Sequence, residues 1–347
     1  MNPKRISFFR FAICFFLLLP SFLCVKSYAF ERHLWDEGWR FALHNDDKAH
    51  ETTFDDHAWR VLDLPHDWAI EGDFYALNPS GANGGALPGG IGWYRKHLNL
   101  NDNDASSRYV LHFDGAYMNT SVYVNGQLVG MRPYGFISFS YDITPYLKKQ
   151  GDNVVAVKVD NSKQPNSRWY TGCGIYRHVY LMKSSDIRIE EWGVQALTEV
   201  KKGKGKVSLS TKIENPSGRS RRVIVHQTLW NKAHQMVSKA SKACQVEAKG
   251  ATISQLLNVN KPQLWSLESP NLYTITTEIE ENGRILDRDT ISIGLRNVAF
   301  DVKKGFFLNG KNIKINGVCL HGDLGCLGTA INEDALYRQL LMMKDMG

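Results

Sequence analysis

The chain has 347 residues, 43% of them hydrophobic, which is long enough for two or three domains with buried cores. Its formal net charge of +7 includes four basic residues and no acid in residues 1–29, so +3 remains for the other residues. A surplus of this size, without strands that interleave basic and aromatic residues, excludes nucleic-acid binding as an expected function.

The N-terminus is typical of a secretory signal. A basic start precedes an apolar region from Phe11 to Val25, and Ser27-Tyr28-Ala29 places small residues at the −3 and −1 positions of a cleavage site. We expect cleavage near Ala29 and a periplasmic or secreted product. A lipoprotein attached at Cys24 is a weaker alternative, because Leu23 is larger than the residue that a lipoprotein peptidase accepts. No later segment is apolar enough to span a bilayer.

Residues 30–183 consist of short strand patterns separated by turn signals, which predicts a β-sandwich of the jelly-roll type. Apolar residues alternate in 109–113, and a later apolar run meets Asn125-Gly126, a strong hairpin signal. The glycine-rich stretch 80–92 lacks the Gly-Lys-Ser/Thr ending of a phosphate cradle. We expect it to be a surface loop at one end of the sandwich.

The most distinctive stretch is 166–181, which reads NSRWYTGCGIYRHVYL. Gly172 and Gly174 permit a tight loop, in which Trp169 and Tyr170 offer flat rings for the apolar faces of a pyranose and arginine offers hydrogen-bond donors for its hydroxyls. A buried aromatic corner between two strands explains the same residues, and the residues alone favour it. A strand is then predicted by the alternating positions Ile175, Arg177, Val179 and Leu181.

Residues 184–298 form a second strand-rich unit of about 115 residues, the size of an immunoglobulin-like β-sandwich. Asn282-Gly283 predicts a hairpin within it. Four lysines in 201–206 are interrupted by two glycines, which preclude a rigid basic face, so we expect a solvated turn there.

Residues 299–347 change in pattern. A hairpin is predicted around Asn309-Gly310, followed by a short apolar strand at 317–320 with polar residues at its C-terminal end. Asn332 is placed to cap a helix with two acids in its first turn. The apolar face of this helix comprises Leu336, Leu340 and Met343. This order predicts the first βα unit of an incomplete (β/α)8 barrel, since a complete barrel needs about 250 residues.

Several of these segments resemble glycoside hydrolase family 2, the β-galactosidase family. The stretch 166–181, Leu64-Pro65-His66-Asp67-Trp68 and the segment 87–96 are similar to its sugar-binding domain, and Gly294-Leu295-Arg296 is similar to its linking sandwich. The resemblance implies a retaining, exo-acting β-glycosidase of the β-galactosidase type that hydrolyses terminal β-linked sugars. Its carbohydrate substrate would be a β-galactoside or a related β-glycoside.

Catalysis is not assigned to any residue of this chain. In the family both catalytic glutamates lie on later barrel strands, so the resemblance implies that the chain is inactive alone. Asn332-Glu333 imitates the family's Asn-Glu pair, but it stands at the start of the predicted helix, where a capping role is expected.

Substrate-binding roles are implied by the resemblance for His321, Asp323, Arg168 and Trp169. His321 matches a family histidine that contacts a sugar hydroxyl, although a lone histidine is more often a local hydrogen-bonding residue. Gly322 departs from the family, where His or Glu is usual. Arg168 stands near a position that is acidic in other members, and because arginine only donates hydrogen bonds, the identity of the sugar stays open.

Four cysteines follow residue 29, at positions 173, 244, 319 and 326, without a C-x-x-C pair or zinc-finger spacing. We therefore expect no structural metal, and no residues are assigned to a metal or a cofactor. Disulfide pairing, and the oligomeric state and metal requirement of full-length relatives, stay open. Two functions remain: the β-glycosidase, and a non-catalytic carbohydrate-binding β-sandwich protein. The coding sequence downstream of Gly347 would separate them, because a barrel encoded there supports the first function. Failing that, the chain is assayed with a chromogenic β-galactoside, for which we expect no turnover by the chain alone.

Overall fold

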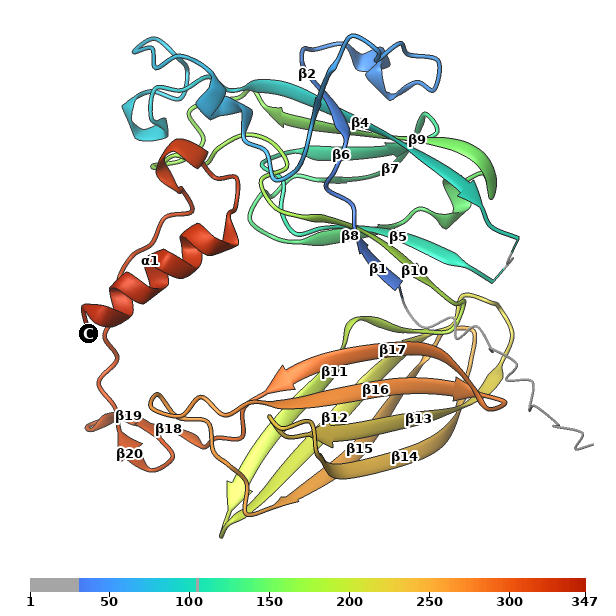
Figure 1. Cartoon of the computed structure of the whole chain (residues 1–347), viewed down its shortest axis with the longest axis vertical. Helices are drawn as coiled ribbons and strands as arrows, with labels where there is room; N and C mark the ends of the chain where they lie inside the picture. Colours follow the sequence, from blue (N-terminus) through green and yellow to red (C-terminus); the bar gives the residue numbers. More distant parts are fainter. Residues whose placement is uncertain (1–30, 104–105) are drawn as a thin grey trace, which may run out of the picture.

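The computed structural model describes residues 31–103 and 106–347, in which two β-sandwiches are followed by a small hairpin sheet and one α-helix (Figure 1). The chain is mainly β, as predicted. The expected signal peptide, residues 1–29, lies outside the described residues. Within the described ranges, no helix is long and apolar enough to cross a membrane.

The first sandwich is built from two antiparallel sheets, ordered β1-β10-β5-β8 and β3-β2-β4-β9-β6-β7. Its strands are β1 (Glu31–Leu34), β2 (Trp39–Leu43), β3 (Arg60–Leu62), β4 (Gly90–Asn101), β5 (Arg108–Phe113), β6 (Thr120–Val124), β7 (Gln127–Arg132), β8 (Phe139–Asp142), β9 (Gln150–Asn161) and β10 (Val179–Ser184). Short 3-10 helices lie in its loops: η1 (Asp47–His50), η2 (Trp68–Glu71), η3 (Ala82–Gly84) and η4 (Thr144–Tyr146). Alternate residues of both sheets fill the core, among them the fully buried Trp39, Leu111, Phe113 and Val157.

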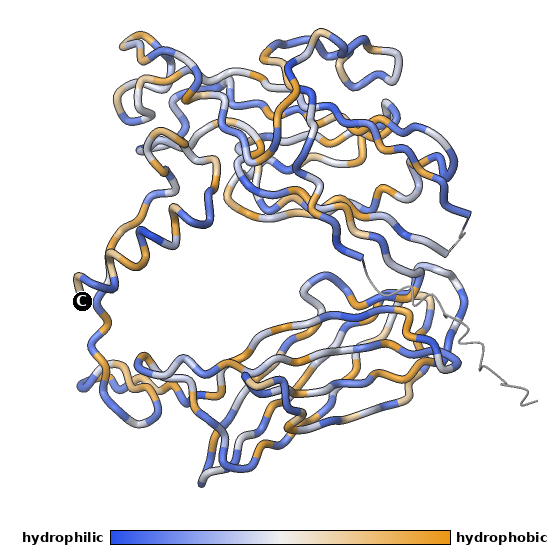
Figure 2. The backbone as a smooth tube through the Cα atoms, viewed as in Figure 1, coloured by the Kyte–Doolittle hydropathy of each residue, from blue (hydrophilic) through white to orange (hydrophobic). Residues whose placement is uncertain are grey.

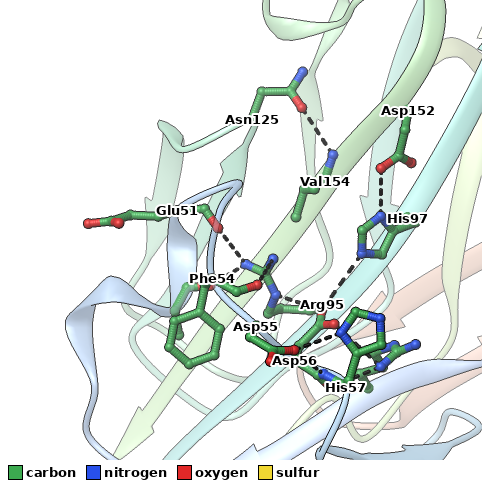
Figure 3. Close-up of polar contacts among 12 residues, drawn as sticks. Glu51, Phe54, Asp55, Asp56, His57, Arg95, His97, Asn125, Asp152 and Val154 are labelled. Carbon is green, nitrogen blue, oxygen red and sulfur yellow. Dashed lines mark hydrogen bonds and ion pairs between the residues drawn. The ribbon is translucent and has the colours of Figure 1, made fainter.

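A buried arginine holds the long loop between β2 and β3 onto the first sandwich (Figure 3). The Nε of Arg95 in β4 donates to Oδ2 of Asp56 at 2.8 Å, and its Nη1 donates to the carbonyl oxygens of Ala49 and Glu51 at 2.5 and 3.0 Å. Because an unpaired charge inside a protein is costly, these acceptors fix the loop.

The second sandwich consists of the antiparallel sheets β11-β12-β15 and β14-β13-β16-β17. Its strands are β11 (Arg188–Lys201), β12 (Lys204–Glu214), β13 (Arg221–Trp230), β14 (Met236–Val246), β15 (Ala251–Asn260), β16 (Tyr273–Glu281) and β17 (Arg284–Ile293). Buried and exposed residues alternate along β12, and Figure 2 shows this alternation in hydropathy. Such a period of two is what a strand with one face in a core requires.

Three Asn-Gly pairs form hairpin turns, as the sequence predicts. Both residues have a positive φ at 125–126, 282–283 and 309–310. This is the geometry of a type I′ turn, which suits the right-handed twist of the strands that it joins.

The C-terminal region begins with the sheet β18-β19-β20, formed by β18 (Val298–Asp301), β19 (Gly305–Leu308) and β20 (Lys311–Asn312). After a short 3-10 turn, η5 (Gly325–Leu327), the helix α1 spans Glu333–Asp345. Its cap is confirmed, because Oδ1 of Asn332 accepts from the backbone N–H of Ala335 at 2.9 Å. Residues 317–320 adopt no strand: no described strand lies beside them to share backbone hydrogen bonds.

The two sandwiches are joined through His112 of β5, which is 5% exposed. Its Nε2 lies 2.9 Å from Oδ1 of Asp114, and its Nδ1 lies 2.5 Å from Oε1 of Glu191 on β11 of the second sandwich. Because a carboxylate faces each ring nitrogen, both contacts are hydrogen bonds only when the ring carries two protons. Burial disfavours that charged form, but Glu191 and Asp114 outweigh it and raise the pKa of His112 above its usual value.

We expect this joint to weaken as the pH rises. A histidine with a raised folded-state pKa contributes stability that is complete below its unfolded pKa of about 6.5 and is lost as the pH rises through the folded-state pKa. His112→Gln should therefore lower the free energy of unfolding by roughly 1–3 kcal/mol at low pH, and by less at high pH.

Denaturant unfolding of the wild type and of His112→Gln, at about pH 6 and about pH 9, measures the change in the free energy of unfolding. Burial raises the pKa of Asp287 to about 7, so that residue also titrates in this range. The readout is therefore the difference between the two proteins at each pH. A difference that stays the same at both values would contradict the expectation.

Candidate functional site

The loop that carries the predicted site residues is closed at its base by Asn161, the last residue of β9. Its Nδ2 donates to the carbonyl oxygen of Gly172 at 3.1 Å and to Sγ of Cys173 at 3.0 Å, while its Oδ1 accepts from Nδ2 of Asn166 at 2.7 Å. Arg168 and Trp169 lie between these anchors and are exposed.

The strand predicted from Ile175 begins only at Val179, because the backbone before it bonds to other segments. His66 N–H donates to the carbonyl oxygen of Ile175 at 2.8 Å, and Ile331 N–H donates to that of Tyr176 at 3.0 Å. These carbonyl groups are therefore not available to a sheet neighbour. The same bonds fasten residues 66 and 331 to the loop.

Asp67 is the centre of this arrangement. Its side chain is 2% exposed and accepts five hydrogen bonds from three segments of the chain. The donors are the backbone N–H groups of Ala69 (3.1 Å), Cys173 (2.9 Å) and Thr329 (2.9 Å), and the hydroxyl groups of Tyr170 (2.5 Å) and Thr329 (3.1 Å). A buried carboxylate needs such donors, so it draws the loop 162–178 and the segment 324–331 together.

Two glycines allow this close approach. Both have a positive φ, +69° at Gly172 and +59° at Gly328. A Cβ at Gly172 would lie 1.9 Å from Oγ1 of Thr329, and a Cβ at Gly328 would lie 2.4 Å from Oδ2 of Asp67. A side chain at either position would therefore force the segments apart.

The docked segments bring Trp169 and His321 into contact. Their ring centroids are 5.8 Å apart with 42° between the ring planes, and both side chains are exposed. Of the four predicted site residues, these two touch each other. Arg168 is exposed and makes no hydrogen bond or ion pair with any other residue in the described part of the chain.

Asp323 is also exposed and acts on Tyr170 through its charge. Burial first, then the charge of Asp67 and its hydrogen bond, and to a smaller extent Asp323, raise the pKa of Tyr170 well above its usual value. The phenol therefore keeps its proton and donates to Asp67 throughout the physiological range.

The surface beside Trp169 is a shallow platform. A depression of about 10 Å³ lies there, room for about one water, so a larger ligand would rest on the surface rather than enter it. Its lining includes Trp169, Tyr170, Leu87 and Gln164. Within the described residues, no group of three or more His, Cys, Asp or Glu side chains is arranged to hold a metal ion, and Cys173, Cys244, Cys319 and Cys326 are free thiols.

Sequence reasoning missed Asp67 and Thr329. Asp67 carries a local signal, because an Asp before the short helix η2 is a typical N-cap and its Oδ1 does accept from Ala69. Thr329 carries none, since its partner lies 262 positions away.

We expect Asp67→Asn to release the segment 324–331. The amide keeps the shape of the carboxylate but removes its charge. Its NH₂ group would also face N–H and O–H donors, with which it cannot form hydrogen bonds as an acceptor. The free energy of unfolding should therefore fall by roughly 2–4 kcal/mol. Hydrogen exchange should become faster in 324–331 and in the loop 162–178, and stay unchanged in β4 and β9. The exposed Asp73→Asn is the control. Unchanged protection of 324–331 in Asp67→Asn would contradict this account.

Comparison with known proteins identifies the family of the chain. The description "Glycosyl hydrolases family 2, sugar binding domain" fits residues 33–185, and "Glycosyl hydrolases family 2" fits residues 187–296. The β-galactosidase BoGH2A of Bacteroides ovatus is 48% identical over 319 residues, which cover 91% of this chain and 38% of that protein. A protein of Formosa agariphila named putative β-glucuronidase is 37% identical over 314 residues, which cover 90% of this chain and 30% of that protein.

Solved structures give the same result. A glycosyl hydrolase family 2 member from Bacteroides cellulosilyticus matches with a TM-score of 0.88 and 33% identity, over 91% of this chain and 42% of that one. A β-glycosidase from Bacteroides vulgatus matches with a TM-score of 0.85 and 36% identity, over 91% and 40%. The chain thus spans about three tenths to two fifths of the length of these relatives. It belongs to glycosyl hydrolase family 2.

Proposed function

We propose that the protein is an exported, retaining β-glycosidase that removes terminal β-linked sugars, and that Trp169 and His321 form part of its sugar platform. Relatives in the same family are named β-galactosidases and β-glucuronidases, which supports a β-glycosidase at the level of the family. The observation that carries the proposal for this chain is the contact between the two rings on a platform fixed by Asp67.

The chemistry of the platform suits a sugar. The exposed indole of Trp169 offers an apolar face for a pyranose, and the imidazole of His321 offers a donor or an acceptor for a hydroxyl. Arg168 and Asp323 add a donor and an acceptor from the same two segments. Such a mixture of one flat apolar face and a few polar groups is typical of carbohydrate recognition.

Arg168 bears on the class of sugar. Its guanidinium is exposed and carries no ion pair within the described residues. A planar guanidinium pairs with a carboxylate through two parallel hydrogen bonds, so it would favour a uronic acid more than a neutral sugar. We therefore include β-glucuronides beside β-galactosides among the proposed substrates.

We expect sugar binding by the chain to depend on Trp169. In a titration with galactose and with glucuronic acid, followed by tryptophan fluorescence and saturation-transfer NMR, Trp169→Ala should weaken binding of both sugars roughly tenfold. Arg168→Gln should weaken only glucuronic acid. The control is Trp192→Ala, an exposed tryptophan on β11. Equal loss in Trp169→Ala and Trp192→Ala would contradict the assignment.

We expect the chain by itself not to hydrolyse a chromogenic β-galactoside or β-glucuronide. Retaining hydrolysis requires two carboxyl groups about 5–5.5 Å apart, and the family resemblance assigns both to later barrel strands. Turnover that persists through purification and disappears in Trp169→Ala would contradict this expectation.

A non-catalytic carbohydrate-binding protein is the second candidate. The shallow platform favours it, because an open surface suffices for binding a sugar. Sugar binding without turnover by the longest natural product of the gene would support this candidate over the glycosidase.

A further inference from the structure

One end of the second sandwich carries a dense net positive charge. The sequence shows only the lysines of 201–206 as a run, but the fold places basic residues from other segments beside it. We call this surface the basic end; its residues, all exposed, are Lys201, Lys202, Lys204, Lys206, Lys261, Arg296, Lys303, Lys304, Lys311 and Lys314.

Hydrogen bonds join the segments of the basic end directly. Lys261 N–H donates to the carbonyl oxygen of Gly203 at 3.0 Å, which ties the end of β15 to the turn between β11 and β12. Asn297 exchanges two hydrogen bonds with Val200, at 2.8 and 3.1 Å, and its own backbone N–H donates to Oδ1 of Asn309 at 3.0 Å. These bonds therefore join the turn, the strand end and the hairpin sheet β18-β19-β20, which lies beside the second sandwich in Figure 1.

The charges of the basic end are mostly unpaired. Ten cations stand against three acids, Glu199, Glu268 and Asp301, a net of +7. Residues 30–347 carry +3 in total, so the rest of them carries −4. Lys201 pairs with Glu199, and Lys311 lies 3.6 Å from Glu268, both at exposed sites where pairing contributes little. The other eight cations form no ion pair with a described residue.

We propose that the basic end binds a polyanionic glycan, such as a chain bearing sulfate or uronate groups. Dense positive charge on one surface attracts polyanions and releases their counterions. Nine of the ten cations are lysines, whose compact charges suit separate sulfate or carboxylate groups along a flexible polymer. The surface would hold such a polymer independently of the platform at Trp169.

A glycan fits this surface better than a lipid bilayer does. Exposed apolar side chains occur at the basic end on β18 and beside it, at Phe300 and Val302. Six of the ten cations, however, lie on the sandwich itself and not on this hairpin sheet. Binding in a bilayer interface also requires a large apolar face, which two side chains on one side of this surface do not supply.

Binding of the full chain to dextran sulfate, with uncharged dextran as the blank, tests the proposal. Affinity should fall as the salt concentration rises from about 50 to about 200 mM. The triple variant Lys202→Gln, Lys204→Gln and Lys261→Gln should bind roughly tenfold more weakly than the wild type at low salt.

The matched control removes three exposed cations from the opposite end of the same sandwich: Arg219→Gln, Arg222→Gln and Lys249→Gln. It changes the net charge equally and should bind within about twofold of the wild type. Trp169→Ala should also bind like the wild type, so failure of the sugar platform would not affect this test. The proposal would be overturned if both triple variants lost affinity equally, or if the wild type did not bind dextran sulfate at low salt. It would also be overturned if the wild type bound duplex DNA or phosphatidylserine vesicles more tightly than dextran sulfate.

Discussion

The need to satisfy one buried carboxylate determines how the parts of the candidate site meet. Asp67 is almost fully buried, and its carboxylate accepts five hydrogen bonds from protein donors in segments near residues 69, 170 and 329. None of these segments satisfies the charge alone. The hydrogen bonds of Asp67 therefore set where the loop with Trp169 lies relative to the segment with His321. Asp67 is buried, so a ligand on the exposed platform would not touch it.

Buried charges play the same part elsewhere in the molecule. Arg95 holds the loop between β2 and β3, and His112 with Glu191 holds the two sandwiches together. The hydrophobic effect explains why each sandwich has a core, but it is non-directional and does not fix how a loop or a domain is oriented. Charged hydrogen bonds do, because they require particular atoms at particular angles. In this protein the packed cores supply stability, while a few buried charges fix how loops and domains are oriented.

Much of the fold could be predicted from sequence because the decisive signals are local. The Asn-Gly turns need a positive φ at two adjacent residues, alternation records which face of a strand is buried, and Asn332 caps the helix that starts beside it. The start of β10 and the absence of a strand at 317–320 were not predictable in this way, since both depend on which neighbours are present to accept hydrogen bonds. For the site, the resemblance to family 2 implied roles for Arg168, Trp169, His321 and Asp323. It included the segment of Asp67 but gave that residue no role, because the partners of Asp67 meet only once the chain has folded.

The hydrogen bonds between Asp67 and Thr329 form late in the synthesis of the chain. They span 262 positions, so a ribosome has already produced both sandwiches when the threonine emerges. Domains generally fold as they are made, from the N-terminus onward. Before Thr329 is synthesised, water solvates the side of the Asp67 carboxylate to which Thr329 later binds. The surface that carries Trp169 and His321 is thus completed late in biosynthesis, after both sandwiches.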